Sequence, residues 1–450
     1  MRLEPAGAHA ERCAALLATL GGDGAAQPLG LAKRTSNLFR DRREAPKRRL
    51  DLSGFRHVLE VDPEAGWVDV EGSTTYEALV DATLPFGVMP AVVPQLKTIT
   101  VGGAAAGVGI EATSFRQGLV HHGLLELEVL LADGQVVVCT PVNEHRDLFH
   151  GFANSYGTLG YALRLRLRTL PVRPFVEVRH ERCADARTFF DGLAAACADP
   201  RSDFVDGVVF DAGTLVLNRG AFVDAAPWSS DYGFEHIYHR SLLERELDYV
   251  SARDYLWRWD TDWFWCSRNF GLQRPWLRRL FGRARLNSRT YTRLMRWNAR
   301  WGVTRRWSRV RGRHPESVIQ DVDIPLPQAA TFLAFLLREI GILPIWICPL
   351  QAPRGAEAPL YPLAGGTLHV NFGFWDVIGS RDAHPPGHWN RLIEREVMRL
   401  GGIKSLYSES YFTPEEFDAA YGMRDYAALK ARYDPAHRLL GLYEKCVHGA

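Results

Sequence analysis

The sequence predicts an α+β fold in two large domains, and three observations support this prediction. The chain has 450 residues, which is long for one hydrophobic core and short for three. In the first third, short strand pairs are followed by one helix and then by a hairpin, so the order is not the β-α-β-α order of a parallel sheet. After Pro171 to Pro174 the pattern changes to long strands and amphipathic helices, for example at 326–340. We therefore expect a domain boundary near residue 174.

Each element of the first third has its own signal. Alternating apolar residues and turn residues predict strands at 57–62, 67–72, 125–131, 135–139 and 163–170. Thr74 is expected to open a helix, with Glu77 completing a capping box and Pro85 ending the helix. The glycine-rich stretch 93–123 is expected to be irregular.

Positive charge is concentrated in one segment. Residues 263–313 contain fifteen arginines and no Asp or Glu, so the remainder carries a net charge of −13 within a chain of net charge +2. Six tryptophans interleave with the arginines: Trp263, Trp265, Trp276, Trp297, Trp301 and Trp307. This pattern favours contact with an anionic lipid surface or substrate, and a solvated basic helix pair is the alternative. Nucleic acid is not an expected partner, because no reader motif accompanies the charge.

Seven cysteines are scattered through the chain without a Cys-x-x-Cys motif or a Cys/His ligand spacing. We therefore expect a reduced, cytoplasmic protein without structural zinc, with peripheral contact as its only membrane association. The N-terminus lacks a basic start followed by a long apolar run, so neither a signal peptide nor a transmembrane helix is expected. The histidines at 121–122, 145 and 150 lack a third ligand, so no metal is expected. No Gly-x-Ser-x-Gly motif indicates a hydrolase.

The run from Thr100 to Gly109 is the most informative segment. Glycines let the backbone approach a ligand closely, and exposed N–H groups in such a loop can cradle a pyrophosphate. A P-loop is excluded because no Gly-Lys-Ser/Thr follows. The spacing of Gly107, Gly109 and Ala112 fits a Rossmann fingerprint, with Glu128 near the position of a ribose acid. However, no Val/Ile strand precedes it and no crossover helix follows. A structural loop without a ligand is the other alternative.

Motifs across the first third resemble the FAD-binding domain of the vanillyl-alcohol-oxidase (PCMH-type) superfamily. They are Pro94-Gln95, Thr100 to Gly103, Gly118, the Leu-Ala-Asp-Gly hairpin at 131–134, Asp147 to Phe149 and Gly157 to Gly160. Further motifs resemble the sterol side-chain reductase (24-dehydrocholesterol reductase, or diminuto) family within it. They are Gly107 to Ser114, Gln320-Asp321, Pro344 to Pro349 and Leu406 to Tyr411. The resemblance covers most of the chain.

This resemblance implies a two-subdomain FAD-binding domain at 1–174 and an α+β substrate-binding cap domain with an antiparallel sheet at 175–410. A C-terminal segment, 411–450, would return to the FAD-binding domain. The implied FAD contacts are Thr35, Ser36, Asn37, Pro94, Gln95, Thr100, Val101, Gly102, Gly103, Gly107, Gly109, Ile110, Glu111, Thr113, Ser114, Gly157, Thr158, Gly160 and Leu163. Many relatives hold FAD covalently through a histidine in the first loop. Here that loop, 33–39, has neither His nor Cys, so a non-covalent flavin is expected.

The resemblance also implies reduction of a C=C bond in a hydrophobic, sterol- or isoprenoid-like substrate, with NADPH as a candidate electron donor. FAD would supply the hydride, and the protein would supply one proton. An isolated C=C bond needs an acid that stays protonated near neutral pH, and burial raises the pKa of a carboxyl group in that way. The catalytic candidates are Glu409, Asp321, His369, Tyr407 and Tyr411, and the pocket candidates are Trp346, Cys348 and Asn371. For Glu409 a hydrogen-bonding role is the alternative, and for His369 a structural one.

Two other functions stay open. One is oxidation of a C–OH bond on a polyprenyl-phosphate sugar or another alcohol, as in the decaprenylphosphoryl-ribose oxidases, whose lipid phosphate would suit the arginines. The other is a flavin-binding lipid carrier without turnover. The sequence does not decide the direction of hydride flow, because a flavin serves both directions.

Overall fold

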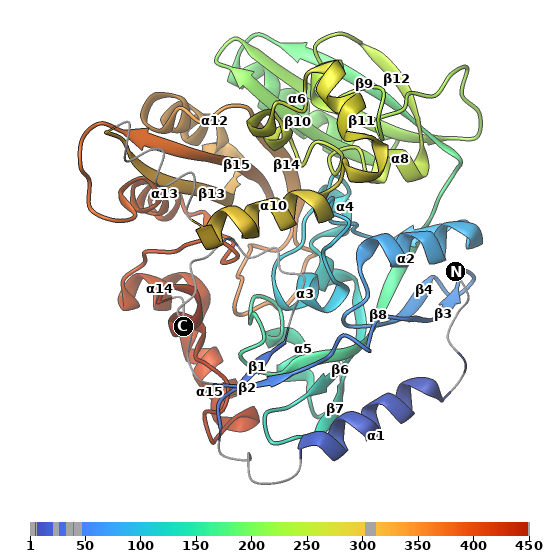
Figure 1. The fold of residues 1–450 in the computed structure, drawn as a ribbon, viewed down its shortest axis with the longest axis vertical. Coiled ribbons are helices and arrows are strands. Elements are labelled where there is room, and N and C mark those ends of the chain that lie inside the picture. Colours follow the sequence, from blue (N-terminus) through green and yellow to red (C-terminus); the bar gives the residue numbers. More distant parts are fainter. Residues whose placement is uncertain are drawn as a thin grey trace.

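The computed structural model describes residues 5, 7–20, 27–32, 39, 47–301 and 312–448. The chain has the predicted α+β fold, with two large and separate sheets (Figure 1). A six-stranded sheet from the N-terminal third lies in the lower half of Figure 1, and an eight-stranded antiparallel sheet lies in the upper half. Two short parallel strands, β1 (Leu29–Leu31) and β2 (Arg48–Leu50), pair separately.

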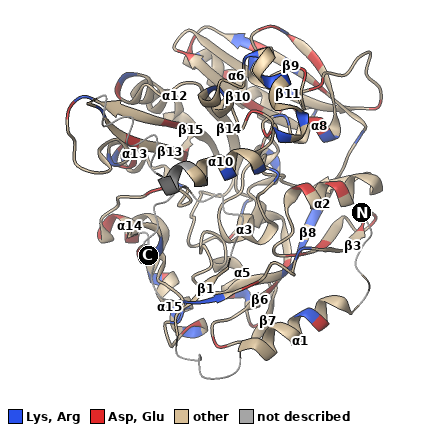
Figure 2. Cartoon of the chain, viewed as in Figure 1, with Lys and Arg blue, Asp and Glu red and all other residues tan. Residues whose placement is uncertain are grey.

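The six-stranded sheet has the order β3-β4-β8-β6-β7, with β5 paired to β8. Its strands are β3 (Val58–Asp62), β4 (Trp67–Glu71), β5 (Val88–Pro90), β6 (Leu124–Leu130), β7 (Val136–Cys139) and β8 (Tyr161–Pro171). The five predicted strands are therefore confirmed. In β8, Leu165 and Leu167 join the core beneath helices α2 (Tyr76–Thr83) and α3 (Val101–Ala106). Basic residues recur along the same strand (Figure 2), and Arg164 and Arg166 both pair with Asp69 of β4.

Two local predictions were wrong. Helix α2 is capped by Thr75, whose Oγ1 accepts a hydrogen bond from the N–H of Ala78 at 3.3 Å. Thr74 is not the cap, because its buried hydroxyl is directed to the carbonyl of His57 and the N–H of Glu77 donates to the carbonyl of Lys97, whose side chain also pairs with Glu77. The glycine-rich stretch 93–123 is partly helical, since its alanines favour α3 and it also contains α4 (Ser114–Gln117) and a 3-10 turn at Val120–Gly123.

The eight-stranded sheet has the order β12-β9-β11-β10-β14-β15-β13-β16. Its strands are β9 (Phe175–Cys183), β10 (Phe204–Asp211), β11 (Thr214–Val223), β12 (Leu247–Ser251), β13 (His314–Pro325), β14 (Ile345–Gln351), β15 (Leu368–Ser380) and β16 (Ile403–Lys404). Helices α6 (Ala186–Ala198), α12 (Leu326–Phe335) and α13 (His388–Arg399) cover one face. A π-helical turn continues α12 to Ile340, which confirms the helix predicted at 326–340.

The two faces of this sheet differ because side chains alternate along each strand. Val322 of β13 and Phe372 of β15 pack into the core formed with the helices. Their neighbours Asp321 and Asn371 therefore lie on the opposite face, as does Trp346 of β14, which packs in the core shared with the N-terminal sheet. The strands thus present a row of polar and aromatic side chains toward the first domain.

The C-terminal helices lie against the N-terminal sheet. They are α14 (Pro414–Tyr421), α15 (Met423–Tyr433) and α16 (Leu442–Cys446). Helix α15 packs on α5 (Arg146–Gly151), and the buried Lys430 donates hydrogen bonds to the carbonyl of Thr158 at 2.9 Å and to Asp434 at 2.6 Å. We propose that the chain is divided into an FAD-binding domain at 1–174, a cap domain at 175–410 and a C-terminal segment at 411–450.

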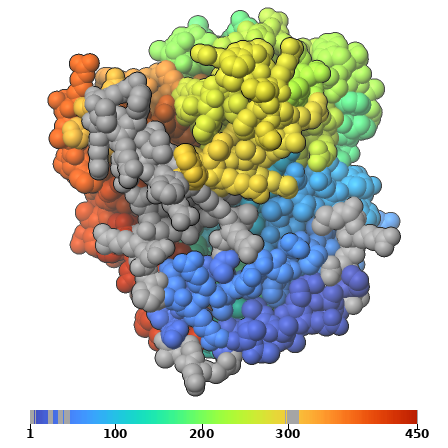
Figure 3. All heavy atoms as spheres, viewed as in Figure 1, coloured from blue at the N-terminus to red at the C-terminus, as the bar shows by residue number. Residues whose placement is uncertain are grey.

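The described part of the Arg/Trp segment, residues 263–301, belongs to the cap, where Figure 3 shows it in yellow above the blue N-terminal third. It contains α9 (Pro275–Phe281) and α10 (Ser288–Trp301). Among the described residues of the segment, Arg268 pairs with Asp376, Arg278 with Asp262, Arg283 with Asp231 and Arg289 with Glu77. Trp263 and Trp265 are buried, whereas Trp276, Leu280 and Trp297 are exposed; Trp307 lies outside the described residues. Among the described residues, none of the helices has the length and apolar composition that crossing a bilayer requires.

Candidate functional site

The glycine run forms the short helix α3, which starts after Thr100. The N–H groups of Val101 and Gly102 donate to the carbonyls of Thr74 and Gly72, both at 2.9 Å, so they are not available to a ligand. Gly103 is the exposed residue of this segment. A pyrophosphate could therefore approach the backbone at Gly103, but not at the two residues before it.

The other glycines of the run serve packing. A Cβ at Gly102 would lie 2.8 Å from the carbonyl oxygen of Gly72, and a Cβ at Gly109 would lie 2.6 Å from Cγ2 of Val120. Gly107 is buried beside Tyr156. These positions bring α3 and the following loop close to the sheet, which explains why the segment is glycine-rich on both sides of the exposed Gly103.

The loop 109–114 is held in a fixed shape and is joined to the cap. The Thr113 hydroxyl donates to the carbonyl of Ala91 at 2.8 Å, and the N–H of Glu111 donates to Oγ of Ser114 at 3.0 Å. The carbonyl of Ala112 accepts a hydrogen bond at 2.9 Å from the N–H of Val205, in β10 of the cap. Ile110 packs at the edge of the core.

A buried ion-pair cluster strengthens this junction. Nη2 of Arg258 lies 3.0 Å from Oε1 of Glu111 and 2.7 Å from Oδ2 of Asp206, with all three side chains almost fully buried. The Arg258 guanidinium stacks 4.0 Å above the ring of Tyr255. Burial raises the pKa of Glu111 to about 7, although the positive charge of Arg258 opposes the increase. The second carboxylate oxygen of Glu111 is buried and has no hydrogen-bond partner among the described residues.

Sequence reasoning missed two members of this cluster. Asp206 stands alone in the apolar strand Phe-Val-Asp-Gly-Val-Val-Phe, and Arg258 stands between Trp257 and Trp259. A charge enclosed by apolar or aromatic neighbours predicts a buried, paired residue, and this signal was available in the sequence.

On the cap face, Asp321 is a buried acid. Burial raises its pKa to about 8, and a hydrogen bond with Tyr407 offsets this only in part. Nε1 of Trp375 donates to the Tyr407 hydroxyl at 3.1 Å, which gives a chain from the indole through the phenol to the carboxyl group. Oδ1 of Asp321 is buried without a hydrogen-bond partner in the described part of the chain. The space it occupies depends on Gly373 of β15, where a Cβ would lie 2.7 Å away.

A second polar network lies on the same face of the sheet, around Asp323, two residues after Asp321 on β13. Asp323 accepts hydrogen bonds from the Tyr361 hydroxyl at 2.7 Å and from Nδ2 of Asn371 at 2.8 Å. Burial raises the pKa of Asp323. His369 is buried two residues before Asn371, and its Nδ1 lies 3.1 Å from the carbonyl of Thr367.

The environment of Glu409 is different. It is half-buried and its Oε2 accepts a hydrogen bond at 3.0 Å from the hydroxyl of Tyr411. The N–H of Tyr411 donates to the buried carboxylate of Glu394, which also pairs with Lys404. Glu409 is therefore part of a hydrogen-bonded group at the cap edge, which corresponds to the alternative role stated for it above.

Aromatic rings surround the Asp321 region. Phe264 lies 4.5 Å from Trp375, 5.5 Å from Trp346 and 5.1 Å from Trp259, as measured between ring centroids. Cys348 is fully buried on the same face as Trp346. The predicted pocket residues are thus brought together with Asp321, and the aromatic residues that precede 266 were not predicted as part of the pocket.

The remaining predicted FAD contacts have mixed environments. Thr35, Ser36 and Asn37 lie outside the described residues. Gln95 follows Pro94 and is buried, with no described partner for its Nε2. In the loop Gly157 to Gly160 the Thr158 hydroxyl donates to the carbonyl of Ser155 at 2.7 Å, and Leu163 belongs to the core.

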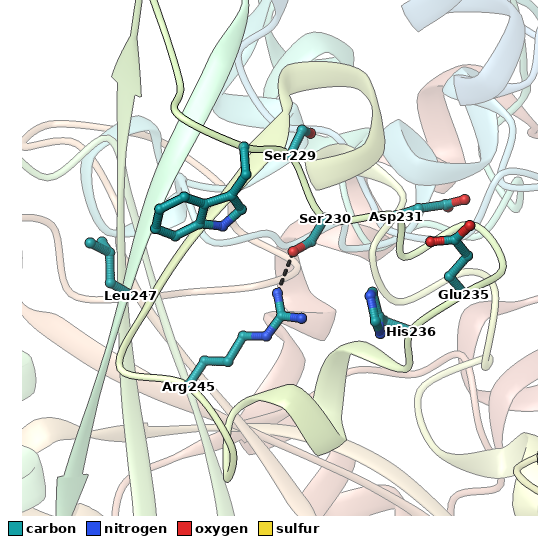
Figure 4. Close-up of a pocket in the computed structure, with 8 residues that line it drawn as sticks. Ser229, Ser230, Asp231, Glu235, His236, Arg245 and Leu247 are labelled. Carbon is teal, nitrogen blue, oxygen red and sulfur yellow. Dashed lines mark hydrogen bonds between the residues drawn. The ribbon is translucent and has the colours of Figure 1, made fainter.

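These features fit a flavin dinucleotide. An exposed glycine on α3 allows the approach of a phosphate, and the unpartnered polar atoms of Gln95, Glu111 and Asp321 are suited to polar groups of a bound ligand. An open cavity of about 430 Å³ lies elsewhere, between Trp228 and Leu247 on the cap. Figure 4 shows Arg245 and Ser230 hydrogen-bonded within it; none of its lining residues belongs to the predicted site.

Comparisons with known proteins agree with this assignment. Residues 34–140 match the FAD binding domain family. The chain is 28% identical to the Delta(24)-sterol reductase of Homo sapiens over 434 residues, covering 87% of this chain and 76% of that protein. It is 27% identical to the Delta(24)-sterol reductase of Arabidopsis thaliana over 448 residues, covering 89% and 76%. Cytokinin dehydrogenase 9 of Oryza sativa is 27% identical over 165 residues, covering 36% and 32%. The chain is therefore an FAD-binding oxidoreductase homologous to the Delta(24)-sterol reductases.

Proposed function

We propose that the protein reduces an isolated C=C bond of a hydrophobic, sterol- or isoprenoid-like substrate, a reaction of the CH–CH class. Non-covalently bound FAD supplies the hydride when it is reduced, and NADPH is the proposed electron donor. The FAD would be held by Gly103, Gln95 and the loop 109–114. The observation that carries the proposal is the carboxyl group of Asp321, which has a buried oxygen without a partner among the described residues and whose pKa burial raises to about 8.

The proton step follows from the substrate. An isolated C=C bond has no neighbouring group to polarise it, so protonation of one carbon prepares the other to accept hydride. Asp321 gives its proton to the alkene and becomes a carboxylate, and the hydride completes the second new C–H bond. Tyr407 can return a proton to Asp321 from solvent through their hydrogen bond. A carboxyl group with a pKa near 8 is protonated at neutral pH and can still release its proton, which suits a general acid.

The aromatic residues support the same step. Protonation of an alkene leaves a positive charge on carbon, and the faces of Trp375, Trp346 and Phe264 can stabilise a cation by roughly 0.5–2 kcal/mol each. These rings also exclude water, which would otherwise add to the cation. We therefore assign the proton-donor role to Asp321 and a supporting role to Glu409.

A polyprenyl-phosphate substrate is less well supported. The arginines of 263–313 were expected to bind its phosphate group, but in the described part of the segment Arg268, Arg278, Arg283 and Arg289 form ion pairs within the protein. The exposed Trp276, Leu280 and Trp297 support contact with a lipid surface as a further proposal, through which a hydrophobic substrate could be collected.

Anaerobic stopped-flow absorbance tests the reaction. NADPH should bleach the yellow protein, and a sterol with a side-chain alkene should restore the colour. In Asp321→Asn the bleaching should persist, while reoxidation by the alkene should slow by about 10²- to 10⁴-fold, the usual value of a positioned acid. Glu409→Gln is the matched control and should reoxidise within a small factor of wild type. Bleaching by a polyprenyl sugar, or wild-type reoxidation in Asp321→Asn, would contradict the proposal.

A further inference from the structure

A cluster of three different donor groups lies on the far side of the N-terminal sheet. Helix α1 (Ala8–Leu20) carries His9 and Cys13 one turn apart, and Glu128 faces them from β6. Nε2 of His9 lies 2.9 Å from Oε1 of Glu128, and Sγ of Cys13 lies 3.4 Å from that nitrogen and 3.7 Å from that oxygen. We propose that His9, Cys13 and Glu128 bind a zinc ion that fastens α1 to the sheet.

The donor separations suit zinc. Bonds of about 2.0–2.3 Å in tetrahedral geometry place neighbouring donor atoms roughly 3.3–3.6 Å apart. The two separations that involve sulfur, 3.4 Å and 3.7 Å, are within about 0.2 Å of the tetrahedral values, and the nitrogen–oxygen separation has to open by about 0.4 Å. A mixed set of nitrogen, thiolate and carboxylate ligands is one that zinc accepts in proteins.

The surroundings of His9 favour a ligand orientation. Its Nδ1 lies 2.8 Å from Oε1 of the fully buried Glu71, which is held in turn by Arg12 at 2.7 Å and by His57 at 2.8 Å. When Nδ1 donates to Glu71 and Nε2 carries no proton, the lone pair of Nε2 faces Glu128, and a metal ion between these two acceptor atoms, 2.9 Å apart, takes the place of a second ring proton. A carboxylate behind a metal-binding histidine is a common arrangement that fixes its tautomer.

The local charge is also suitable. A Zn²⁺ ion with one thiolate and one carboxylate ligand is neutral, and the charge of Glu71 is balanced by Arg12. The second oxygen of Glu128 lies 3.5 Å from Nε of Arg164, so only its first oxygen faces the cluster. His9 and Glu128 are 15% and 13% exposed, so a water molecule can reach the fourth position.

The site is separate from the proposed flavin site. Figure 1 shows α1 along the lower edge of the molecule, at the end opposite the cap. The sequence analysis predicted no metal and did not consider His9 with Cys13, and Glu128 is 115 residues beyond Cys13. The ion would join the N-terminal helix to β6 through three protein ligands, with one coordination position open to water.

The experiment uses the full-length flavoprotein, treated with a chelator, dialysed and titrated with zinc or cobalt. We expect one zinc per chain with a Kd of about 1 μM or lower, and a thiolate-to-cobalt charge-transfer band in the near ultraviolet. Loss of a direct ligand in Cys13→Ala or Glu128→Gln should weaken zinc binding by more than about 100-fold, the upper range for loss of an outer-shell partner. Flavin content should be unchanged, which shows that the variants fold.

Cys183→Ser is the matched control, because Cys183 is also partly exposed but lies outside the cluster. It should keep both the zinc and the cobalt band. Less than one zinc bound at micromolar concentration, or equal binding by wild type and Cys13→Ala, would overturn the proposal and leave an ion-paired cluster with a protonated His9. If Cys13→Ala does not fold, absence of the cobalt band from the wild-type protein would overturn it alone.

Discussion

Replacement of Arg258 by Met tests the junction between the loop 109–114 and the cap. The change removes the positive charge but keeps an apolar side chain of similar length beside Tyr255. Glu111 and Asp206 are then left fully buried without a counter-ion, and the loss of one member of a buried ion pair costs about 3–5 kcal/mol. We expect a decrease of that size in the free energy of unfolding near pH 8.

The pH dependence of this loss is specific to the mechanism. The folded-state pKa of Glu111 is about 7, above its ordinary value of 4.5. The contribution of this raised pKa to the free energy of unfolding is therefore fully present below pH 4.5 and is lost as the pH rises through 7. Without Arg258 the pKa of Glu111 rises further, so the destabilisation caused by the substitution grows as the pH rises. The deficit of Arg258→Met should therefore be smaller at about pH 5.5 than at about pH 8.

Urea unfolding followed by tryptophan fluorescence at both pH values measures these differences. Arg253→Met is the matched control, because Arg253 lies only five residues before Arg258, on helix α8 (Ala252–Leu256), and forms an exposed pair with Asp81. It should cost less than about 1 kcal/mol, as surface pairs usually do. A loss below 1 kcal/mol in Arg258→Met, or a loss that does not change with pH, would refute the reasoning.

Three further predictions concern the proton donor, the phosphate approach and the lipid surface. Reoxidation of the reduced flavin by the alkene should slow as the pH rises through about 8, because Asp321 then loses its proton; a rate that is flat from pH 6 to about pH 9 would contradict this. Gly103→Val should give a folded apoprotein, since the branched side chain fills the space through which the phosphate approaches the backbone. A normal flavin-to-protein absorbance ratio in this variant would exclude the segment from the FAD site. The protein should co-sediment with anionic liposomes more than with neutral ones, by roughly 1 kcal/mol for each basic residue near the surface. The double substitution Trp276→Ala and Leu280→Ala should weaken binding to anionic liposomes. The substitution Trp228→Ala should not, because Trp228 is an exposed tryptophan outside the segment.

The regular elements were predictable because each depends on local periodicity. The alternation of leucine and arginine at 163–170 predicted β8, and the turn residues at 132–134 predicted the β6–β7 hairpin. The cap of α2 was misplaced by one residue, because Thr74 and Thr75 are both suitable and a tertiary hydrogen bond to the carbonyl of His57 decides between them. Such a contact is not visible in the local sequence.

The sequence allowed us to predict which residues belong to the candidate site, but not which of them is the buried acid. Resemblance identified Glu409 and Asp321 together, but their burial depends on strands that are far apart in the sequence. Asp321 lies where β13 and β15 pair, beside the space left by Gly373, and only the sheet register brings these two residues together. The cluster of His9 with Glu128 has the same origin, since its members come from α1 and β6.

The bond between the carbonyl of Ala112 and the N–H of Val205 has a consequence for the lifetime of the cofactor complex. The segment proposed to lie beside the flavin is attached both to the N-terminal sheet and to a central strand of the cap. Separation of the two domains at this point would have to break this hydrogen bond and the adjacent buried pair of Arg258 with Glu111. Escape of FAD would require a local unfolding event at the domain junction, so the dissociation rate should follow the opening frequency of that junction and change little when the phosphate contacts alone are altered.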